Sequence, residues 1–101
     1  KNGAIYFISS IAASENLIGN ASYSISKNAL NFSAKILSNE QNKRNIRVNT
    51  ISLGLIKNQM GIKVRKMTNT NKKFVSIKDL IKKIKIILKN NRINKKNINI
   101  L

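Results

Sequence analysis

The sequence contains no cysteine, no histidine and no proline, and only three of its 101 residues are acidic. Without cysteine, neither a disulfide framework nor a thiolate metal site can form. Without histidine, the commonest metal ligand and the usual general base are missing as well, so we expect no metal site. Any proton transfer must therefore be carried by tyrosine, lysine, serine or one of the three carboxylates.

Long apolar runs are also missing. No uninterrupted run approaches the ~20 residues that a membrane-spanning helix needs, and the apolar stretch at residues 5–8 is too short for the core of a signal peptide. We expect a cytoplasmic protein without membrane contact. A chain of 101 residues has room for one small domain or for part of a larger one.

The formal net charge is +17, and most of it lies in residues 57–101, where Asp79 is the single acidic residue. Such a charge makes nucleic-acid binding one candidate function. Lysine, asparagine and isoleucine are abundant throughout, as a strongly AT-rich coding sequence would favour, and this bias alone places lysine on any solvated face. The basic segment has one aromatic residue, Phe74, whereas nucleic-acid binders usually add stacking platforms or a recognition helix. We therefore expect no nucleic-acid partner.

The pattern of apolar residues predicts five elements of secondary structure. Short β-favouring runs predict strands at 4–9, buried on both faces, and at 46–53, and a third strand begins near 98–101. A broad apolar face predicts a helix from 21 to about 38, followed by a polar break at 39–45. Ser76, with Asp79 in an approximate capping box, predicts a helix from 76 to about 89. Residues 55–75 show no clear periodicity, and we expect them to be the most mobile segment.

Strand, helix, strand, helix, strand is the order of a parallel α/β sheet with right-handed crossovers. We therefore predict an α/β fold with about three parallel strands and flanking helices. Ligand sites in such sheets lie at the carboxyl ends of the strands. Here those ends are the segments around Ser10 and Gly54.

Three side chains near these ends carry groups suited to proton transfer. Tyr23 and Lys27 are four residues apart near the start of the first predicted helix, so their side chains share one face. Ser10 ends the preceding strand, and the intervening loop can bring it back towards the start of that helix. A hydroxyl, a phenol and an ammonium group can thus converge, and a nearby cation favours the ionised form of a phenol.

The residues around these side chains follow a familiar order: GAIYFISS at 3–10, YSISKNAL at 23–30 and IRVNTISLG at 46–54. This order resembles the second half of the short-chain dehydrogenase/reductase family, in particular members like 3-oxoacyl-carrier-protein reductase. A lone Tyr-x-x-x-Lys pair is a weak signal, but a serine, this pair and an Arg-Val-Asn strand at these separations are together specific. The resemblance is close over residues 3–56 and loose beyond them. It implies part of a Rossmann-type, doubly wound parallel sheet whose N-terminal half is absent, with residues 1–101 as the C-terminal catalytic part of one domain.

The resemblance implies a role for each of the three side chains. Ser10 would hydrogen-bond the oxygen of the substrate. Tyr23 would act as general acid in reduction and as general base in oxidation. Lys27 would bind the ribose of the nicotinamide cofactor and favour the ionised phenol of Tyr23, so that both residues also contact the cofactor. Arg47 and Asn49 of the second strand are expected to be structural, with Asn49 holding the nearby turn by local hydrogen bonds.

The same resemblance implies a binding site for NAD or NADP. The backbone around Gly54 and Ile56 would line the nicotinamide, and Asn58 stands where the family commonly has a cofactor-contacting threonine. Residues 55–75 would form the substrate-binding loop, with a short helical flap. The implied function is the interconversion of a ketone and a secondary alcohol, with a small carbonyl or alcohol compound as substrate and a homodimeric or homotetrameric parent protein.

Two departures from the family pattern qualify this interpretation. Leu53 stands where the family nearly always has proline, and we expect the change to loosen the loop that positions the nicotinamide. The four glycines do not form the glycine-rich turn that binds a pyrophosphate. We therefore interpret the chain as a catalytic fragment that is inactive alone. Two alternatives stay open: a non-catalytic remnant serving as an interaction module, and a basic nucleic-acid-binding protein.

Overall fold

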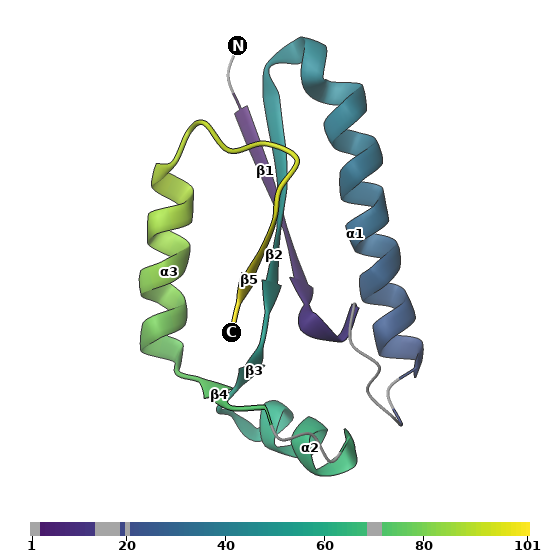
Figure 1. Ribbon diagram of the computed structural model, residues 1–101, viewed down its shortest axis with the longest axis vertical. Helices are drawn as coiled ribbons and strands as arrows, with labels where there is room; N and C mark the ends of the chain where they lie inside the picture. The colour runs from purple at the N-terminus through teal and green to yellow at the C-terminus, as the bar shows by residue number, and fades with distance from the viewer. Residues whose placement is uncertain (1–2, 14–18, 20, 69–71) are drawn as a thin grey trace.

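A computed structural model of the chain describes residues 3–13, 19, 21–68 and 72–101. Its centre is a parallel sheet with the strand order β1-β2-β5 (Figure 1). The three strands are β1 (Gly3–Ser10), β2 (Ile46–Leu53) and β5 (Asn97–Ile100). Strand β2 pairs with β1 along its whole length and with β5 along its second half. The predicted α/β class, with a parallel sheet of three strands and flanking helices, is confirmed.

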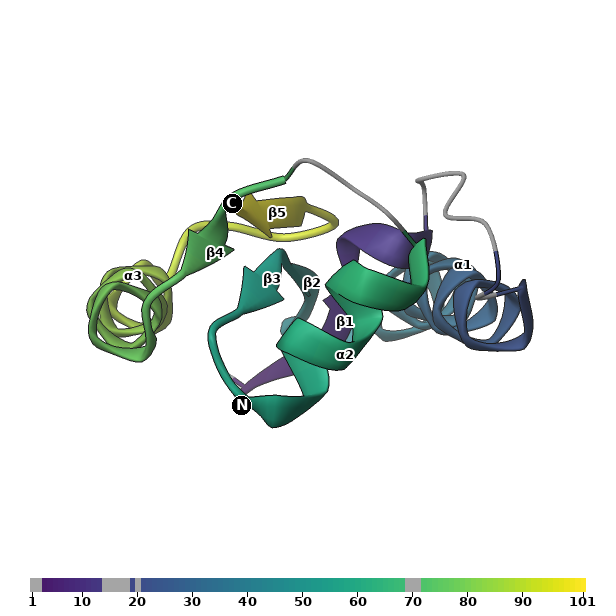
Figure 2. The ribbon, with the colours of Figure 1, turned by 90° about the horizontal axis from the view of Figure 1, so that it is seen from below.

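Two helices cover the opposite faces of this sheet, α1 (Ala21–Gln41) and α3 (Ile77–Lys89) (Figure 2). Alternate side chains of a strand point to opposite faces, so β2 supplies both layers of the core. Val48 and Thr50 lie towards α1, where they line a small cavity with Ala34. Ile51 faces the other way and packs in a buried cluster with Leu80 of α3. The sheet is thus the middle of three layers.

Helix α1 is longer than the sequence predicts. It continues through Gln41 and is followed by a turn of 3₁₀ helix, η2 (Asn42–Arg44), where a polar break was expected at 39–45. Polar residues do not end a helix when they face solvent, and glutamate and glutamine are good helix formers. The segment ends at Asn45, whose left-handed backbone (φ 57°) suits an asparagine after a helix.

The predictions for the last helix and strand are confirmed to within a residue or so. Ser76 caps α3, because its hydroxyl accepts a hydrogen bond from the backbone N–H of Asp79 at 3.1 Å. Strand β5 begins at Asn97 and ends at Ile100, one residue earlier at each end than predicted. None of the helices among the described residues is long and apolar enough to cross a membrane.

Strand β1 differs from the prediction in its burial. It was expected to be buried on both faces, but the side chains of Ile5 and Ile8 are 37% and 46% exposed. The reason is its position: β1 is at the edge of the sheet, and β2 is its only neighbour among the described residues. A run of apolar residues predicts a strand that can be buried, but it does not say how many neighbours the strand has.

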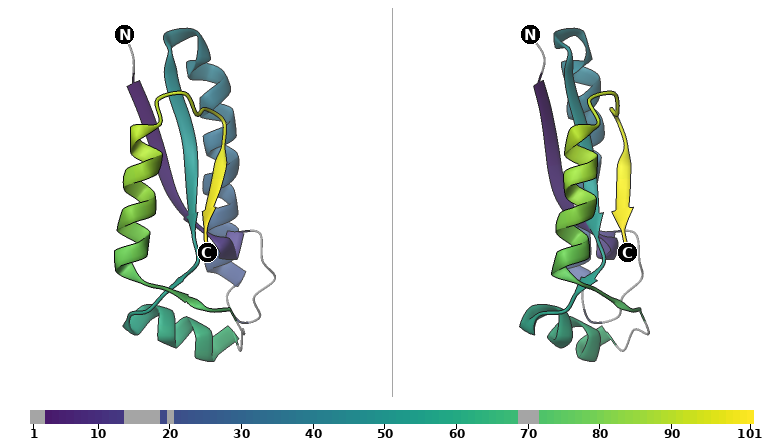
Figure 3. Two further views of the ribbon diagram at one scale, coloured as in Figure 1. Left: turned by 60° about the vertical axis from the view of Figure 1, so that its left-hand side comes forward. Right: turned by 90° about the vertical axis from the view of Figure 1, so that its left-hand side faces the viewer.

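Residues 55–75 have more regular structure than their lack of periodicity suggested. They form a small parallel sheet of β3 (Leu55–Ile56) and β4 (Phe74–Val75), with helix α2 (Gln59–Thr68) between these two strands. Helix α2 lies across the carboxyl ends of β1 and β2 (Figures 2 and 3). A short helix is therefore present in the segment for which the resemblance implied a helical flap, and it is placed to form one wall of a site.

Candidate active site

The carboxyl ends of the two longest strands meet at one level, as predicted. Ser10, the last residue of β1, is the register partner of Leu53, the last residue of β2. A pocket of about 510 Å³ opens at this level, between the strand ends, the first turns of α1 and helix α2. This volume is within the range of ~300–1,000 Å³ that is typical of small-molecule sites.

The start of α1 is attached to the end of β1 by a set of polar contacts. A buried 3₁₀ turn, η1 (Ile11–Ala13), follows β1 and packs on the helix. The side-chain amide of Asn28 donates to the carbonyl of Ala13 at 2.9 Å, and the hydroxyl of Ser9 donates to the carbonyl of Lys27 at 3.5 Å. These contacts fix the position of the first two turns of α1 relative to the end of the strand.

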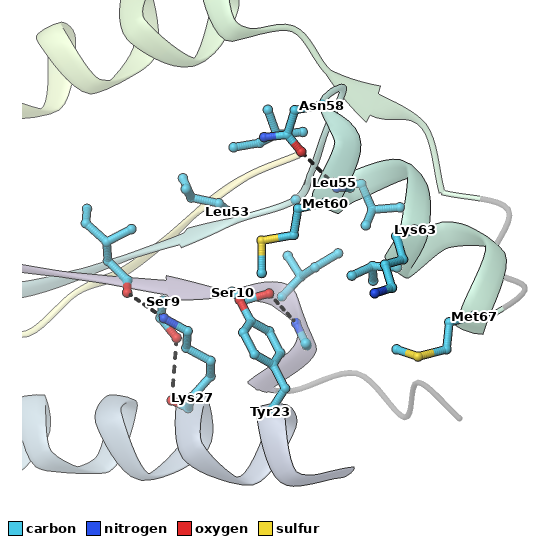
Figure 4. A pocket seen from close by; sticks show the side chains of 17 residues that line it. Ser9, Ser10, Tyr23, Lys27, Leu53, Leu55, Asn58, Met60, Lys63 and Met67 are labelled. Carbon is cyan, nitrogen blue, oxygen red and sulfur yellow. Dashed lines mark hydrogen bonds between the residues drawn. The ribbon is translucent and has the colours of Figure 1, made fainter. Parts of the chain in front are cut away.

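The pocket brings together the three side chains that the sequence singled out. Ser10, Tyr23 and Lys27 all line it, and Figure 4 shows Tyr23 rising from α1 towards Ser10. The Lys27 ammonium lies 5.6 Å from the centre of the Tyr23 ring and donates to the carbonyl of Ile8 at 3.4 Å. The Ser10 oxygen accepts from the backbone N–H of Ala12 at 3.1 Å, which leaves its own hydrogen free to donate to a ligand.

The other predicted site residues lie on the opposite side of the same pocket, and Gly54, Ile56 and Asn58 all line it. The backbone N–H of Gly54 donates to the carbonyl of Ile100 at 2.7 Å, so the segment after β2 is tied to the end of β5. This hydrogen bond restrains the loop that Leu53 was expected to loosen. The side chain of Leu53 packs against the apolar core and also lines the pocket.

Asn58 has a structural role besides its place on the pocket wall. Its side-chain oxygen accepts from the backbone N–H of Gly61 at 2.8 Å, and its carbonyl accepts from the N–H of Ile62 at 2.9 Å, which makes it the N-cap of α2. Asparagine and threonine are both favoured at this position of a helix. Asn58 therefore provides this cap itself, as a threonine at the same position could.

Helix α2 contributes wall residues that the sequence analysis missed: Met60, Lys63, Val64 and Met67. Met60 is followed at three, four and seven residues by Lys63, Val64 and Met67, so the four share one face of the helix. This spacing is visible in the sequence. The periodicity is weak, because a glycine and three basic residues stand among the apolar residues of this helix.

Arg47 and Asn49 lie outside the pocket and hold the connection between α3 and β5. The Arg47 guanidinium donates to the carbonyls of Asn90 (3.0 Å) and Ile93 (3.1 Å). The side chain of Asn49 donates to Ile93 and accepts from the N–H of Lys96, at 3.0 and 3.1 Å. The structural role predicted for Arg47 is confirmed. The prediction for Asn49 was wrong about range, because its partners are more than forty residues away.

Comparison with known families now identifies this arrangement. A family model described as enoyl-(acyl carrier protein) reductase, which belongs to the short-chain dehydrogenases/reductases, matches residues 1–86. The chain belongs to the short-chain dehydrogenase/reductase family. None of the curated proteins matches it significantly in sequence.

Solved structures of short-chain dehydrogenases/reductases superimpose well on the chain. A 4-hydroxyisoleucine dehydrogenase complexed with NADH and succinate is 27% identical, with a TM-score of 0.79 over 98% of this chain and 44% of its own. A short-chain type dehydrogenase/reductase from Mycobacterium ulcerans is 21% identical, with a TM-score of 0.79 over 98% and 40%. An actinorhodin polyketide ketoreductase variant with NADPH is 18% identical, with a TM-score of 0.80 over 98% and 46%. The chain thus spans less than half the length of these proteins.

The pocket fits the nicotinamide end of such a cofactor. It presents a hydroxyl, a phenol and an ammonium group from one side and the backbone of residues 54–56 from the other, and none of its described lining residues is acidic. Ribose hydroxyls and a carboxamide can be met by these donors and acceptors. No glycine-rich turn between a strand and a helix N-terminus, of the kind that holds a pyrophosphate, occurs among the described residues.

Proposed function

We propose that Ser10, Tyr23 and Lys27 are the catalytic residues of an NAD- or NADP-dependent oxidoreductase that interconverts a ketone and a secondary alcohol. The observation that carries this proposal is their convergence on one pocket, although they come from the end of β1 and from α1. The membership of the family supports it, and so do the NADH and NADPH complexes among the similar structures. These complexes include both forms of the cofactor, so the proposal leaves the choice between NAD and NADP open.

In the direction of alcohol oxidation, Tyr23 and Ser10 bind the hydroxyl oxygen of the substrate, and Tyr23 accepts its proton. The ionised oxygen of Tyr23 takes the proton of the substrate hydroxyl and becomes a neutral phenol, while the C–H bond at the same carbon gives up its electron pair as hydride and a carbonyl forms. A bound nicotinamide supplies the acceptor for this hydride. Ser10 donates its hydroxyl hydrogen to the substrate oxygen, and the hydrogen bond from the Ala12 N–H to the Ser10 oxygen orients this hydroxyl.

Lys27 assists in two ways. Its ammonium group lies beside the Tyr23 ring and stabilises the negative charge that the phenol oxygen carries during proton transfer. From the second turn of α1 it also lines the pocket, where its ammonium group would donate to the ribose hydroxyls of a bound cofactor. Because Lys27 is anchored to the carbonyl of Ile8, this charge is held in place before the substrate arrives.

The decisive test is the variant Tyr23→Phe in the full-length protein. Positioned proton transfer contributes roughly 10²–10⁴-fold to a rate, so we expect turnover of secondary alcohols with NAD⁺ or NADP⁺ to fall by at least about a hundredfold. Binding of the reduced cofactor, followed by its fluorescence, should change by no more than about twofold, because the phenyl ring remains.

The chain provides a matched control in its only other tyrosine. The Tyr6 hydroxyl lies away from the pocket and accepts from Arg47 at 3.4 Å, so Tyr6→Phe should leave turnover within about twofold of the wild type. Near-normal turnover by Tyr23→Phe would contradict the proposed role. An equal loss in both variants would show that the loss is one of folding.

We also propose that the full-length protein is a homo-oligomer that associates through α1. Ile25, Phe32 and Ile36 are 69%, 62% and 45% exposed, and their spacing of seven and four residues places them on one side of the helix. A contiguous apolar stripe of this kind on a surface helix marks an interaction site.

A further inference from the structure

The pocket-facing side of α2 is apolar except at one position. Met60, Val64 and Met67 line the pocket at helical spacing, and Lys63 stands among them on the same face. Figure 4 shows the side chain of Lys63 extending from α2 on the pocket side, with Met60 before it and Met67 beyond it. An ammonium group in this position would contact any molecule that binds against the apolar side of α2.

The charged side chains that line the pocket, among the described residues, are all of one sign. Lys27 and Lys63 are the charged side chains among the described lining residues, and they come from opposite walls. Lys27 is turned towards the end of β1 and donates to the carbonyl of Ile8. The described acidic residues, Glu40 and Asp79, lie in the last turn of α1 and the first turn of α3, outside the pocket. Within the part of the chain that the structure describes, no carboxylate therefore faces Lys63 in the pocket.

The abundance of lysine does not explain this position, because the other basic residues of α2 are placed differently. The Arg65 guanidinium lies 4.8 Å from the centre of the Phe74 ring, a cation–π contact that helps to hold α2 on β4. Lys63 and Lys66 are both exposed, but Lys66 does not line the pocket. One helix thus contains a basic residue on the pocket face and another on the solvent face, which makes Lys66 a matched control for Lys63.

We infer that the substrate is an amphiphilic ketone or secondary alcohol that carries an anionic group, and that Lys63 binds this group. The inference rests on the proposed function. The reacting carbon lies at Tyr23, the apolar part of the substrate packs against the methionine-lined wall, and the carboxylate or phosphate pairs with Lys63. Methionine side chains adapt to different shapes, so the wall accepts a range of apolar groups while Lys63 selects for charge.

Hydroxy fatty acids and their methyl esters provide the test, because each pair differs in charge and hardly in shape. A series that varies the separation between hydroxyl and carboxylate is oxidised by the full-length enzyme with NAD⁺ or NADP⁺, and kcat/KM is measured for each acid and each ester. For the best member we expect the acid to be preferred about tenfold, as the loss of one charge-assisted hydrogen bond in a partly exposed site would give.

The variants assign this preference to a residue. Lys63→Met should abolish the preference for the acid while the ester is still oxidised, and Lys66→Met should keep the preference within about twofold. A wild-type enzyme that treats acid and ester alike would overturn the inference, as would equal effects of the two variants. A higher KM for the cofactor in Lys63→Met, with the preference for the acid unchanged, would overturn it too, because the lysine would then bind a cofactor phosphate. If no acid and no ester is oxidised, the proposed function itself fails.

Discussion

The packing of α2 depends on a glycine, and the variant Gly61→Ala tests this dependence. A Cβ atom at this position would collide with the carbonyl oxygen of Ile56, and would also lie 3.0 Å from the carbonyl carbon. Both atoms belong to the backbone of β3, which a change of rotamer cannot move. That same carbonyl oxygen accepts from the N–H of Asn58 at 2.8 Å, so a shift of the strand also disturbs the cap of α2.

Two opposing effects decide the magnitude of the change. Alanine is favoured over glycine inside a helix by ~1 kcal/mol. Overpacking in a close-packed site costs ~1–3 kcal/mol and sometimes more, and a collision with backbone belongs at the upper end of this range. We therefore expect Gly61→Ala to weaken the docking of α2 by about 2 kcal/mol, which corresponds to roughly a thirtyfold change in the opening equilibrium.

Amide hydrogen exchange in the full-length protein measures this opening directly. The amides of residues 59–68 should exchange roughly thirtyfold faster in Gly61→Ala, whereas those of β2 should not change. Gly3→Ala is the control, because a Cβ there would have its nearest neighbour at an ordinary 3.8 Å, the Cγ1 of Ile46. Slower exchange of α2 in Gly61→Ala would show that helix propensity outweighs the collision, and the steric reasoning would be refuted.

Two further predictions concern the cap of α2 and the exposed face of α1. Asn58→Ala removes the acceptor for the N–H of Gly61 and should weaken α2 by ~1 kcal/mol, whereas Asn58→Thr should retain most of the stability. Equal rates of amide hydrogen exchange in α2 for both variants would contradict the capping role. Phe32→Glu should dissociate the full-length oligomer in sedimentation experiments, because it places a charge in the apolar stripe. Ser33→Glu, at the next and also exposed position, should not. An unchanged sedimentation coefficient for Phe32→Glu would contradict association through α1.

Much of this fold can be predicted from the sequence, because local pattern and local structure agree. The helix after Ser76 has a cap and a regular apolar stripe, and Ser76 is confirmed as its N-cap. The polar residues after Ser38 were misinterpreted as a break because composition alone does not distinguish the exposed end of a helix from a loop. The exposure of β1 could not be predicted either, since burial depends on which elements lie beside a strand.

For the candidate site, too, some features could be predicted from the sequence and others could not. The convergence of Ser10, Tyr23 and Lys27 followed from motif and topology, and the pocket contains all three. The residue pattern alone did not predict helix α2, for which the resemblance implied a helical flap, because the pocket face of this helix is short and interrupted by Lys63. The long-range partners of Asn49 could not be foreseen from spacing, because the residues that it binds are brought near only by the return of the chain into β5.

The register between β1 and β2 sets both the position of the site residues and the packing of the core. A slip by a single residue would displace the tip of one strand against the other by ~3.3 Å, which is enough to separate Ser10 from the backbone that faces it. The same slip would turn every side chain of the displaced strand to the wrong layer, so that Val48 and Ile51 would lose their helices. Correct packing of the core therefore also sets the distance between the reactive groups. A chain with a shifted register would lose stability as well as activity.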